Sequence, residues 1–263
     1  MLTRFSPAKA NLFFKVIKKR PDGYHEVASV YTALSLGDFL QIKIESEDRF
    51  FSNEKSLSSD VSNLVIKARD AFRRVTHISD PISIKLQKNI PIGAGLGGGS
   101  SNAATVLWTM NELFGNPLKT KELISIAAEI GSDVPFFFSK GLAYCEGRGE
   151  IIKDARVDIE SPFWIAKHKD YSLNTRLVYD NCIPGEDESG INDLEPAAFR
   201  LIPELRKFKL DLLNLGFSKV SMTGSGSAFL CFGGAIQPRL QRTTFYSVKA
   251  IQRDLNNWYI GER

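Results

Sequence analysis

The chain has 263 residues, of which 43% are hydrophobic and 24% charged, and its formal net charge is +4. This composition is ordinary for a globular protein of one large or two small domains, and it lacks the basic bias of nucleic-acid-binding proteins. No apolar run is long enough to span a membrane, and three widely spaced cysteines do not indicate a disulfide framework. We therefore expect a protein of the bacterial cytoplasm that binds neither nucleic acid nor membrane.

Strands are predicted where apolar and polar residues alternate, and helices where apolar residues recur every three to four positions. In chain order these are strands at 12–17, 27–36 and 39–45, a helix at 63–75, a strand at 82–86, helices at 103–114 and 120–130, strands at 141–145, 150–152 and 163–166, a helix at 203–215, strands at 220–222 and 228–232, and a final helix at 245–255. Without a regular alternation of strand and helix, an α+β fold is favoured. A polar stretch over 153–161 predicts two domains, 1–153 and 154–263.

The most informative segment is residues 91–104, where five glycines fall within seven positions between a predicted strand and a predicted helix. Glycine lets backbone N–H groups converge without side chains in the way, and a helix start adds unpaired N–H groups and a positive dipole end. Ser100 or Ser101 is expected to cap this helix and to offer a hydroxyl to a phosphate. The segment therefore predicts a phosphate-binding loop.

Two common phosphate-loop patterns fit this segment poorly. A Walker loop needs a lysine after its last glycine, and none follows here. The GxGxxG pattern is met by Gly93, Gly95 and Gly98, but the acidic residue expected about 20 positions later, at the end of a second strand, is missing. An NAD-dependent oxidoreductase is therefore a remote alternative.

The same segment resembles the Pro-x-x-x-Gly-Leu-Gly loop, ending in Ser-Ser, of the GHMP kinases, named for galactokinase, homoserine kinase, mevalonate kinase and phosphomevalonate kinase. The resemblance implies a two-lobed fold, with a nucleotide lobe like ribosomal protein S5 domain 2 and a ferredoxin-like C-terminal lobe. It also implies ATP as co-substrate, with Mg²⁺ whose ligands stay unassigned. The residues implied to bind ATP are Pro91, Ile92, Gly93, Ala94, Gly95, Leu96, Gly97, Gly98, Gly99, Ser100 and Ser101, together with Asn63 and Lys88. Asn63 has an equally good interpretation as a helix N-cap.

Two further segments resemble this family's motifs and imply the catalytic residues. Lys9 and Asn11 lie two residues apart, so in a strand they share one face. Asp133 stands in Gly-Ser-Asp-Val-Pro-Phe and would by itself be an ordinary turn residue. The resemblance makes Lys9 and Asp133 the catalytic pair, and it makes the glycine turn at 221–228 a third motif that shapes the site.

The pattern around Tyr24 and His25 resembles one branch of the family, whose substrate is a cytidine-diphosphate-linked methylerythritol used in non-mevalonate isoprenoid synthesis. The residues implied to bind this substrate are Asn11, Tyr24, His25, Thr175 and Tyr179. The implied reaction is ATP-dependent phosphorylation of its 2-hydroxyl. A GHMP kinase for homoserine or a mevalonate-type alcohol and a non-catalytic nucleotide-binding regulator remain alternatives, and the oligomeric state stays open.

Overall fold

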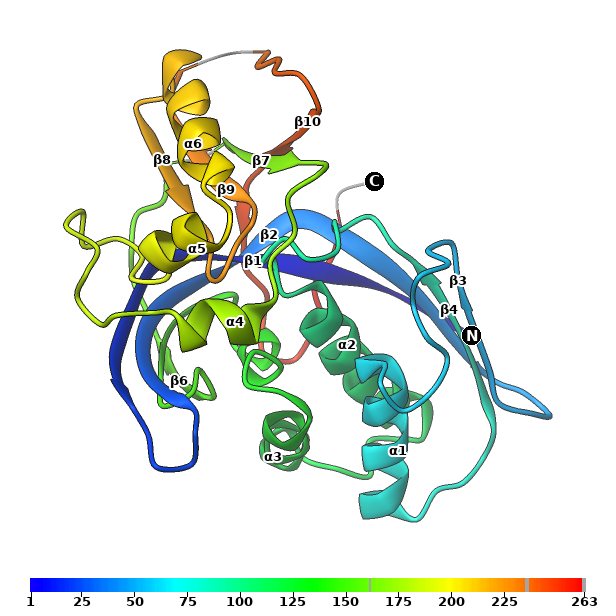
Figure 1. Ribbon diagram of the computed structural model, residues 1–263. Helices are drawn as coiled ribbons and strands as arrows, with labels where there is room; N and C mark the ends of the chain where they lie inside the picture. Colours follow the sequence, from blue (N-terminus) through cyan, green and yellow to red (C-terminus); the bar gives the residue numbers. More distant parts are fainter. Residues whose placement is uncertain (161, 235–236, 262–263) are drawn as a thin grey trace.

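Two long antiparallel strands, β1 (Leu2–Lys19) and β2 (His25–Ile44), run through the molecule (Figure 1). The structure is a computed structural model that describes residues 1–160, 162–234 and 237–261. Along its other edge, β2 pairs with β5 (Leu142–Glu146), then with the short β11 (Ala250–Ile251), then with β4 (Ile82–Gln87). The edge strands β3 (Arg49–Ser52) and β6 (Ile151–Asp154) complete a seven-stranded sheet.

Three helices pack together under the concave side of this sheet: α1 (Leu64–Thr76), α2 (Gly98–Leu113) and α3 (Thr120–Ile130) (Figure 1). α2 is the central helix, and most of its residues are buried because small side chains such as Ala103 and Ala104 let it lie close to β1 and β2. The short 3₁₀ helix η1 (Pro135–Phe138) follows α3 and buries three consecutive phenylalanines. The glycine loop and the Asp133 loop thus both lie at ends of buried helices.

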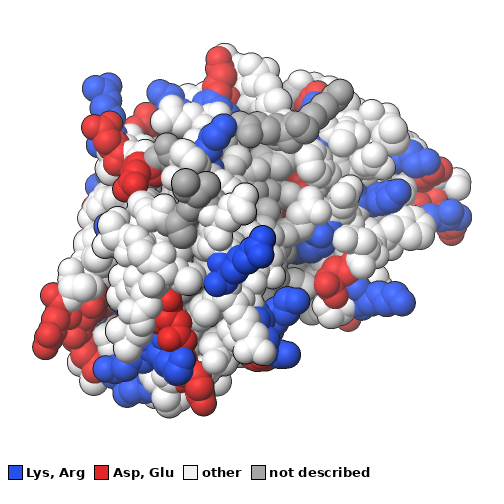
Figure 2. Space-filling model, turned by 90° about the horizontal axis from the view of Figure 1, so that it is seen from above, with Lys and Arg blue, Asp and Glu red and all other residues white. Residues whose placement is uncertain are grey.

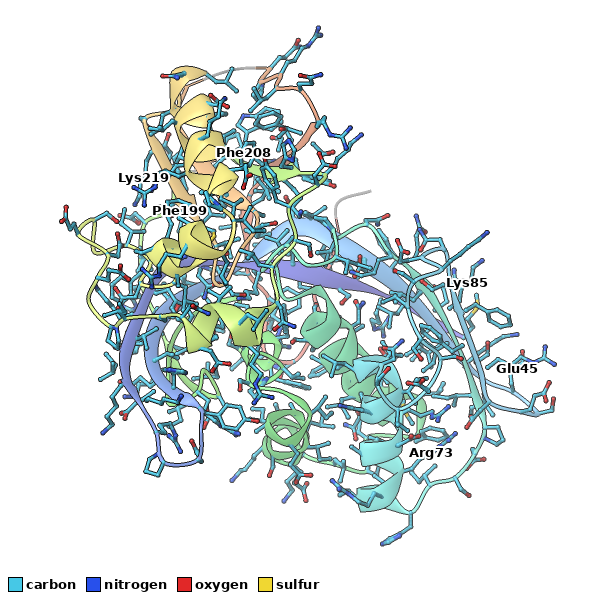
Figure 3. The ribbon with its side chains drawn as sticks, in the orientation of Figure 1. Glu45, Arg73, Lys85, Phe199, Phe208 and Lys219 are labelled. Atoms are coloured by element: carbon cyan, nitrogen blue, oxygen red, sulfur yellow. The ribbon has the colours of Figure 1, made fainter. Side chains whose placement is uncertain are left out.

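A second sheet forms the other lobe, in the strand order β10 (Thr243–Val248), β7 (Phe163–His168), β9 (Phe229–Phe232), β8 (Lys219–Met222). The helices of this half are α4 (Thr175–Asp180), α5 (Glu195–Leu201) and α6 (Glu204–Asn214). Figure 3 labels Phe199 on α5 and Phe208 on α6; their rings lie 6.5 and 5.5 Å from that of Phe229 on β9. These contacts fix both helices against the sheet. The presence of two sheets, each with its own helices, confirms the expected α+β, two-lobed fold.

Several element boundaries differ from the prediction. The strands expected at 27–36 and 39–45 are one continuous strand, β2, and α2 begins at Gly98 rather than at residue 103. The final helix predicted at 245–255 is wrong, because this stretch forms β10 and β11. β-Branched and aromatic residues such as Thr244, Phe245 and Tyr246 favour a strand, and the open edge of β7 supplies the partner.

The C-terminal stretch returns to the first sheet. β11 pairs with β2, and the indole of Trp258 donates a 2.9 Å hydrogen bond to the Phe5 carbonyl. The division into 1–153 and 154–263 stays a prediction, and residue 161 of the predicted linker lies outside the described residues.

No helix within the described ranges is both long and apolar enough to cross a membrane. Figure 2 shows one face of the molecule, on which acidic and basic side chains lie interspersed around a largely uncharged surface. The expected absence of a nucleic-acid partner remains a prediction.

Candidate active site

A cavity of about 980 Å³ is lined by residues from both halves of the chain. Its wall includes parts of β1 and β2, the glycine loop, the loop after α3, helix α4 and the turn between β8 and β9. Of the predicted site residues, those lining it are Lys9, Tyr24, His25, Asn63, Lys88, Pro91, Ile92, Gly93, Ala94, Gly95, Leu96, Gly97, Gly98, Gly99, Ser100, Asp133, Thr175 and Tyr179. The cavity therefore brings nearly all of the predicted residues together. Asn11 and Ser101 lie behind its wall.

The glycine loop ends in the exposed start of α2. Gly97 is the N-cap, with φ of 66°, and no side chain caps the helix. The first bond within the helix runs from Ser101 N–H to the Gly97 carbonyl at 2.9 Å, so the amides of Gly98, Gly99 and Ser100 precede it. These three amides line the cavity at the positive end of the helix dipole, where an anion is stabilised.

The predicted capping role of Ser101 is wrong. Because α2 begins at Gly98, Ser101 lies inside the first turn, fully buried, with its hydroxyl 2.8 Å from that of Ser6 on β1. Ser6 also donates to Asn102 at 2.8 Å. Ser101 therefore joins α2 to β1, and no cap by Ser100 is seen either.

Close packing explains why this loop needs its glycines. The Lys9 amide donates to the Leu96 carbonyl at 2.9 Å, which binds the loop to β1. A Cβ on Gly97 would lie 2.7 Å from Lys9 Cγ, and one on Gly95 would lie 2.4 Å from the Thr223 carbonyl. Glycine therefore lets the loop touch both the lysine and the turn between β8 and β9.

Lys9 and Asp133 meet in the cavity wall. Lys9 Nζ lies 3.3 Å from Asp133 Oδ2 and donates to Asn11 Oδ1 at 2.7 Å. The Lys9 side chain is 5% exposed and that of Asp133 is 30% exposed, so only the carboxylate opens substantially to the cavity. Tyr31 donates to Asp133 Oδ1 at 3.1 Å, and Lys9 Nζ lies 4.7 Å from the centre of the Tyr31 ring. Lysine and tyrosine thus hold one carboxylate from two sides.

Asn11 lies behind Lys9 rather than in the cavity. Its backbone amide donates to Thr223 Oγ1 at 3.0 Å, and its side-chain amide donates to Ser29 Oγ at 3.0 Å. Asn11 is 3% exposed, so the structure shows it orienting Lys9 and joining β1 to the turn between β8 and β9. Its contact with the substrate stays a prediction.

Lys88 and Asn63 flank the glycine loop. Lys88 Nζ lies 2.5 Å from Asp38 Oδ2, and Asp38 Oδ1 also accepts the amides of Asn89 and Ile90. Burial lowers the pKa of Lys88, and the Asp38 charge offsets part of that shift. Asn63 is the N-cap of α1, since its Oδ1 accepts the Val65 amide at 3.0 Å. The interpretation of Asn63 as a helix N-cap is therefore confirmed. Asn63 also lines the cavity, and its contact with ATP stays a prediction.

The far end of the cavity is aromatic. The rings of His25 and Tyr179 stack with centroids 5.2 Å apart, and Phe14 meets Tyr179 edge-on at 6.2 Å. Burial, with the nearby Lys19 charge, lowers the pKa of His25, so the neutral ring is favoured. Thr175 Oγ1 lies 3.0 Å from Ser225 Oγ across the cavity wall. This end offers flat ring faces and hydroxyls, which suit a planar polar ring.

Tyr24 stands at the mouth, 54% exposed, with the Arg148 guanidinium 5.0 Å from its ring centre. Sequence reasoning did not identify Tyr31, Phe14, Lys19 or Arg148 as site residues, although all four line the cavity. Tyr31 and Phe14 lie within ordinary apolar strands that carry no signal for a site. Arg148, between two glycines in a tight turn, was the most detectable of the four.

Comparison with known proteins agrees with this geometry. Residues 63–141 match the family description "GHMP kinases N terminal domain". The chain is 43% identical over 267 residues to the 4-diphosphocytidyl-2-C-methyl-D-erythritol kinase of Protochlamydia amoebophila (strain UWE25), covering 97% of this chain and 92% of that protein. It is 36% identical to the protein of the same name from Chlamydia muridarum (strain MoPn / Nigg), covering 97% of each.

Two solved structures can be superposed on this chain. A crystal structure of 4-(cytidine 5'-diphospho)-2C-methyl-D-erythritol kinase superposes with a TM-score of 0.74 at 33% identity, covering 88% of this chain and 90% of that one. A mevalonate kinase superposes with a TM-score of 0.65 at 13% identity, covering 97% of this chain and 100% of that one, which is a likeness of fold alone.

Proposed function

The chain belongs to the 4-diphosphocytidyl-2-C-methyl-D-erythritol kinases, a branch of the GHMP kinases, and from this we propose that it transfers the γ-phosphoryl group of ATP to the 2-hydroxyl of 4-diphosphocytidyl-2-C-methyl-D-erythritol. It is therefore a phosphotransferase with an alcohol group as acceptor, in isoprenoid precursor synthesis. One observation carries the proposal: a single cavity holds a helix N-terminus, the Lys9–Asp133 pair and the His25–Tyr179 stack. A bacterial cytoplasmic location, testable by cell fractionation, stays part of the proposal.

The proposed nucleotide site is the glycine loop. The amides of Gly98, Gly99 and Ser100 would hold phosphate oxygens at the start of α2. Lys88 lies close to this turn, because a Cβ on Gly98 would be 2.8 Å from Lys88 Nζ. Leu57, Leu64 and Val65 line the cavity on the α1 side and offer an apolar surface for a purine ring.

Asp133 and Lys9 would act on the acceptor hydroxyl. Full removal of an alcohol proton by an ordinary carboxylate would span about 12 pKa units, or about 16 kcal/mol. Such a step is too costly, so the proton leaves late, as the loose phosphoryl transition state forms. Asp133 then works mainly by holding the hydroxyl in line with the phosphorus atom, while the Lys9 ammonium offsets the negative charge that develops.

Mg²⁺ is proposed to enter with ATP and to neutralise phosphate charge. No group of three or more His, Cys, Asp or Glu side chains in the described part of the chain could hold a metal by itself. This fits Mg²⁺, which is commonly held by one or two carboxylates together with substrate phosphates and water. Asp133, the carboxylate beside Lys9, is the residue that would contact it. Turnover undiminished by chelation of divalent cations would contradict this part.

The aromatic end is the proposed cytosine site. A base stacked on Tyr179 beside His25 would place its diphosphate towards the basic side chains of Lys19 and Arg148, which also line the cavity. Replacing Tyr179 by Leu should raise KM for the cytidine substrate about tenfold, since base–aromatic stacking contributes about 1–3 kcal/mol. KM for ATP should change little, because the glycine loop is untouched.

The central experiment measures phosphoryl transfer by the purified chain to the diphosphocytidyl alcohol, to homoserine and to mevalonate. We expect turnover with the first alone, and losses of at least about 100-fold in kcat for Asp133→Asn and Lys9→Met with ATP still bound. Turnover only with homoserine or mevalonate would keep the family and refute the cytidine substrate. No turnover with any of them, with tight ATP binding, would favour a nucleotide-binding regulator.

A further inference from the structure

The turn between β8 and β9 is the part of the second lobe that touches the catalytic lysine. A Cβ on Gly224 would lie 2.9 Å from Asn11 Oδ1 and 3.5 Å from Lys9 Nζ. Thr223 binds Asn11 through its hydroxyl, and Gly224 and Ser225 line the cavity. The backbone of this turn therefore limits the space that is available to the side chains of Lys9 and Asn11.

One buried side chain holds the turn in place. Asn192 is 2% exposed, and its Nδ2 donates to the carbonyls of Met222 at 2.7 Å and Gly224 at 2.9 Å. Its Oδ1 accepts the Leu194 amide at 3.0 Å, so its amide group is bonded at both ends. Both hydrogens of one rigid amide thus fix the two carbonyls that flank Thr223.

Asn192 is itself anchored to the strand that carries Lys9. The Phe14 amide on β1 donates to the Ile191 carbonyl at 2.8 Å, and the Asp193 amide donates back to the Phe14 carbonyl at 3.0 Å. Asp193, 1% exposed, accepts the Val16 amide at 2.9 Å. A closed path of hydrogen bonds therefore runs from β1 through residues 191–193 to the Gly224 turn and back to Asn11 and Lys9.

We propose that Asn192 is a positioning residue for phosphoryl transfer, which holds the Gly224 turn so that Asn11 presents Lys9 to Asp133. This inference rests on the function proposed above. Removing the amide leaves two buried carbonyls without donors, and the turn relaxes away from Asn11. The Lys9 ammonium is then no longer held in place, while the glycine loop keeps its hydrogen bond from the Lys9 amide to the Leu96 carbonyl and the aromatic end keeps the His25–Tyr179 stack. A small displacement of a catalytic group costs rate rather than ground-state binding.

The test is a double-mutant cycle between Asn192→Ala and Lys9→Met, measured by single-turnover kinetics with enzyme in excess. We expect Asn192→Ala to lower the transfer rate at least about tenfold in the native chain and less than about threefold when Lys9 is already replaced. KM for ATP and for the alcohol should stay within about threefold. An equal loss in both backgrounds would overturn the proposal.

Asn111→Ala is the matched control. Asn111 is also a buried asparagine, and its amide holds the turn after α2 through the backbone of Leu118, at the end of the helix remote from the cavity. It should cost comparable stability with little change in transfer rate per folded molecule. A similar rate loss in this variant would show that Asn192 is merely structural. If Asn192→Ala fails to fold, Asn192→Asp keeps the size and removes the donor.

Backbone hydrogen exchange separates this inference from the proposed function. In Asn192→Ala, amides of residues 222–227 should exchange at least about tenfold faster, while those of α2 and α3 stay protected. Were the native chain inactive on the diphosphocytidyl alcohol, the proposed function would fail, yet this selective loss of protection would still support the anchoring role. Unchanged exchange at 222–227 would overturn it.

Discussion

The phenol of Tyr31 donates a hydrogen bond to Asp133, with 3.1 Å between its oxygen and Oδ1. Tyr31 is 2% exposed, and burial together with the nearby carboxylate raises its pKa well above the usual value. The phenol therefore stays protonated and remains a donor. Since Lys9 faces Oδ2, both oxygens of the carboxylate have a partner within the protein, and its orientation is fixed before a substrate arrives.

Tyr31→Phe should lower kcat about tenfold or more, because a hydrogen bond to a charged group contributes about 1.5–3 kcal/mol. KM for ATP should hardly change, since the ring itself is kept and the glycine loop is not contacted. Steady-state kinetics with both substrates would check this. Tyr246→Phe on β10, outside the cavity wall, is the control and should leave kcat unchanged. Equal kcat in Tyr31→Phe and the native chain would refute the orienting role.

Gly97→Ala should nearly abolish activity. Gly97 has φ of 66°, and a Cβ there would lie 2.7 Å from Lys9 Cγ, so the loop or the lysine must move. Gly115→Ala is the matched control, because its φ of 79° is equally unfavourable for alanine while a Cβ would meet nothing within 4 Å. Both variants should lose about 1 kcal/mol of stability or more from backbone strain. Only Gly97→Ala should lose activity at saturating substrate.

Lys88→Met should destabilise the fold by about 3 kcal/mol, because it removes the positive charge that pairs with the buried Asp38 carboxylate. Urea unfolding would measure this loss. The double variant Lys88→Met with Asp38→Asn should regain most of this loss, because Asn can still accept the backbone amides of Asn89 and Ile90. A double variant as unstable as the single one would show that the amides, rather than the ion pair, need the negative charge.

Asp48 lies remote from the active site, and its ion pairs lead us to expect that the stability of the fold depends on pH. Its hydrogen bonds with Arg73, the residue labelled on α1 in Figure 3, lower the pKa of Asp48 from 3.8 to about 2. A carboxylate with a lowered pKa in the folded state adds stability above its unfolded pKa and loses it as the pH falls towards 2. Asp48→Asn should cost about 1–2 kcal/mol at pH 7, a figure reduced because the side chain is 33% exposed. Urea unfolding near pH 2 should show almost no difference between the two chains.

The local patterns predicted much of the fold. The helix expected at 120–130 is α3 to the residue, since its apolar spacing is regular and the Glu122 carboxylate accepts the Lys119 backbone amide at 2.7 Å where the helix begins. The prediction of a helix at 245–255 was wrong, because a short apolar segment does not distinguish helix from strand until a neighbouring strand edge offers hydrogen bonds. α2 begins earlier than predicted because the buried Ser101 and Asn102, bonded to Ser6 on β1, hold its first turn in place despite the poor helix propensity of Gly98 and Gly99.

By itself the sequence indicated a phosphate-binding glycine loop, because backbone freedom at glycine is a local property, and its resemblance to GHMP kinase motifs indicated the kinase family and the roles of Lys9 and Asp133. Tertiary structure alone decided that Tyr31 orients Asp133, that Asn11 lies behind Lys9 rather than in the cavity, and that Asn192 supports the Gly224 turn. Each of these is a contact between residues distant in the chain, or a matter of which face is buried. Such contacts exist only once β1, β2 and the second sheet have packed, because packing sets the distances and removes the water that would otherwise satisfy these groups.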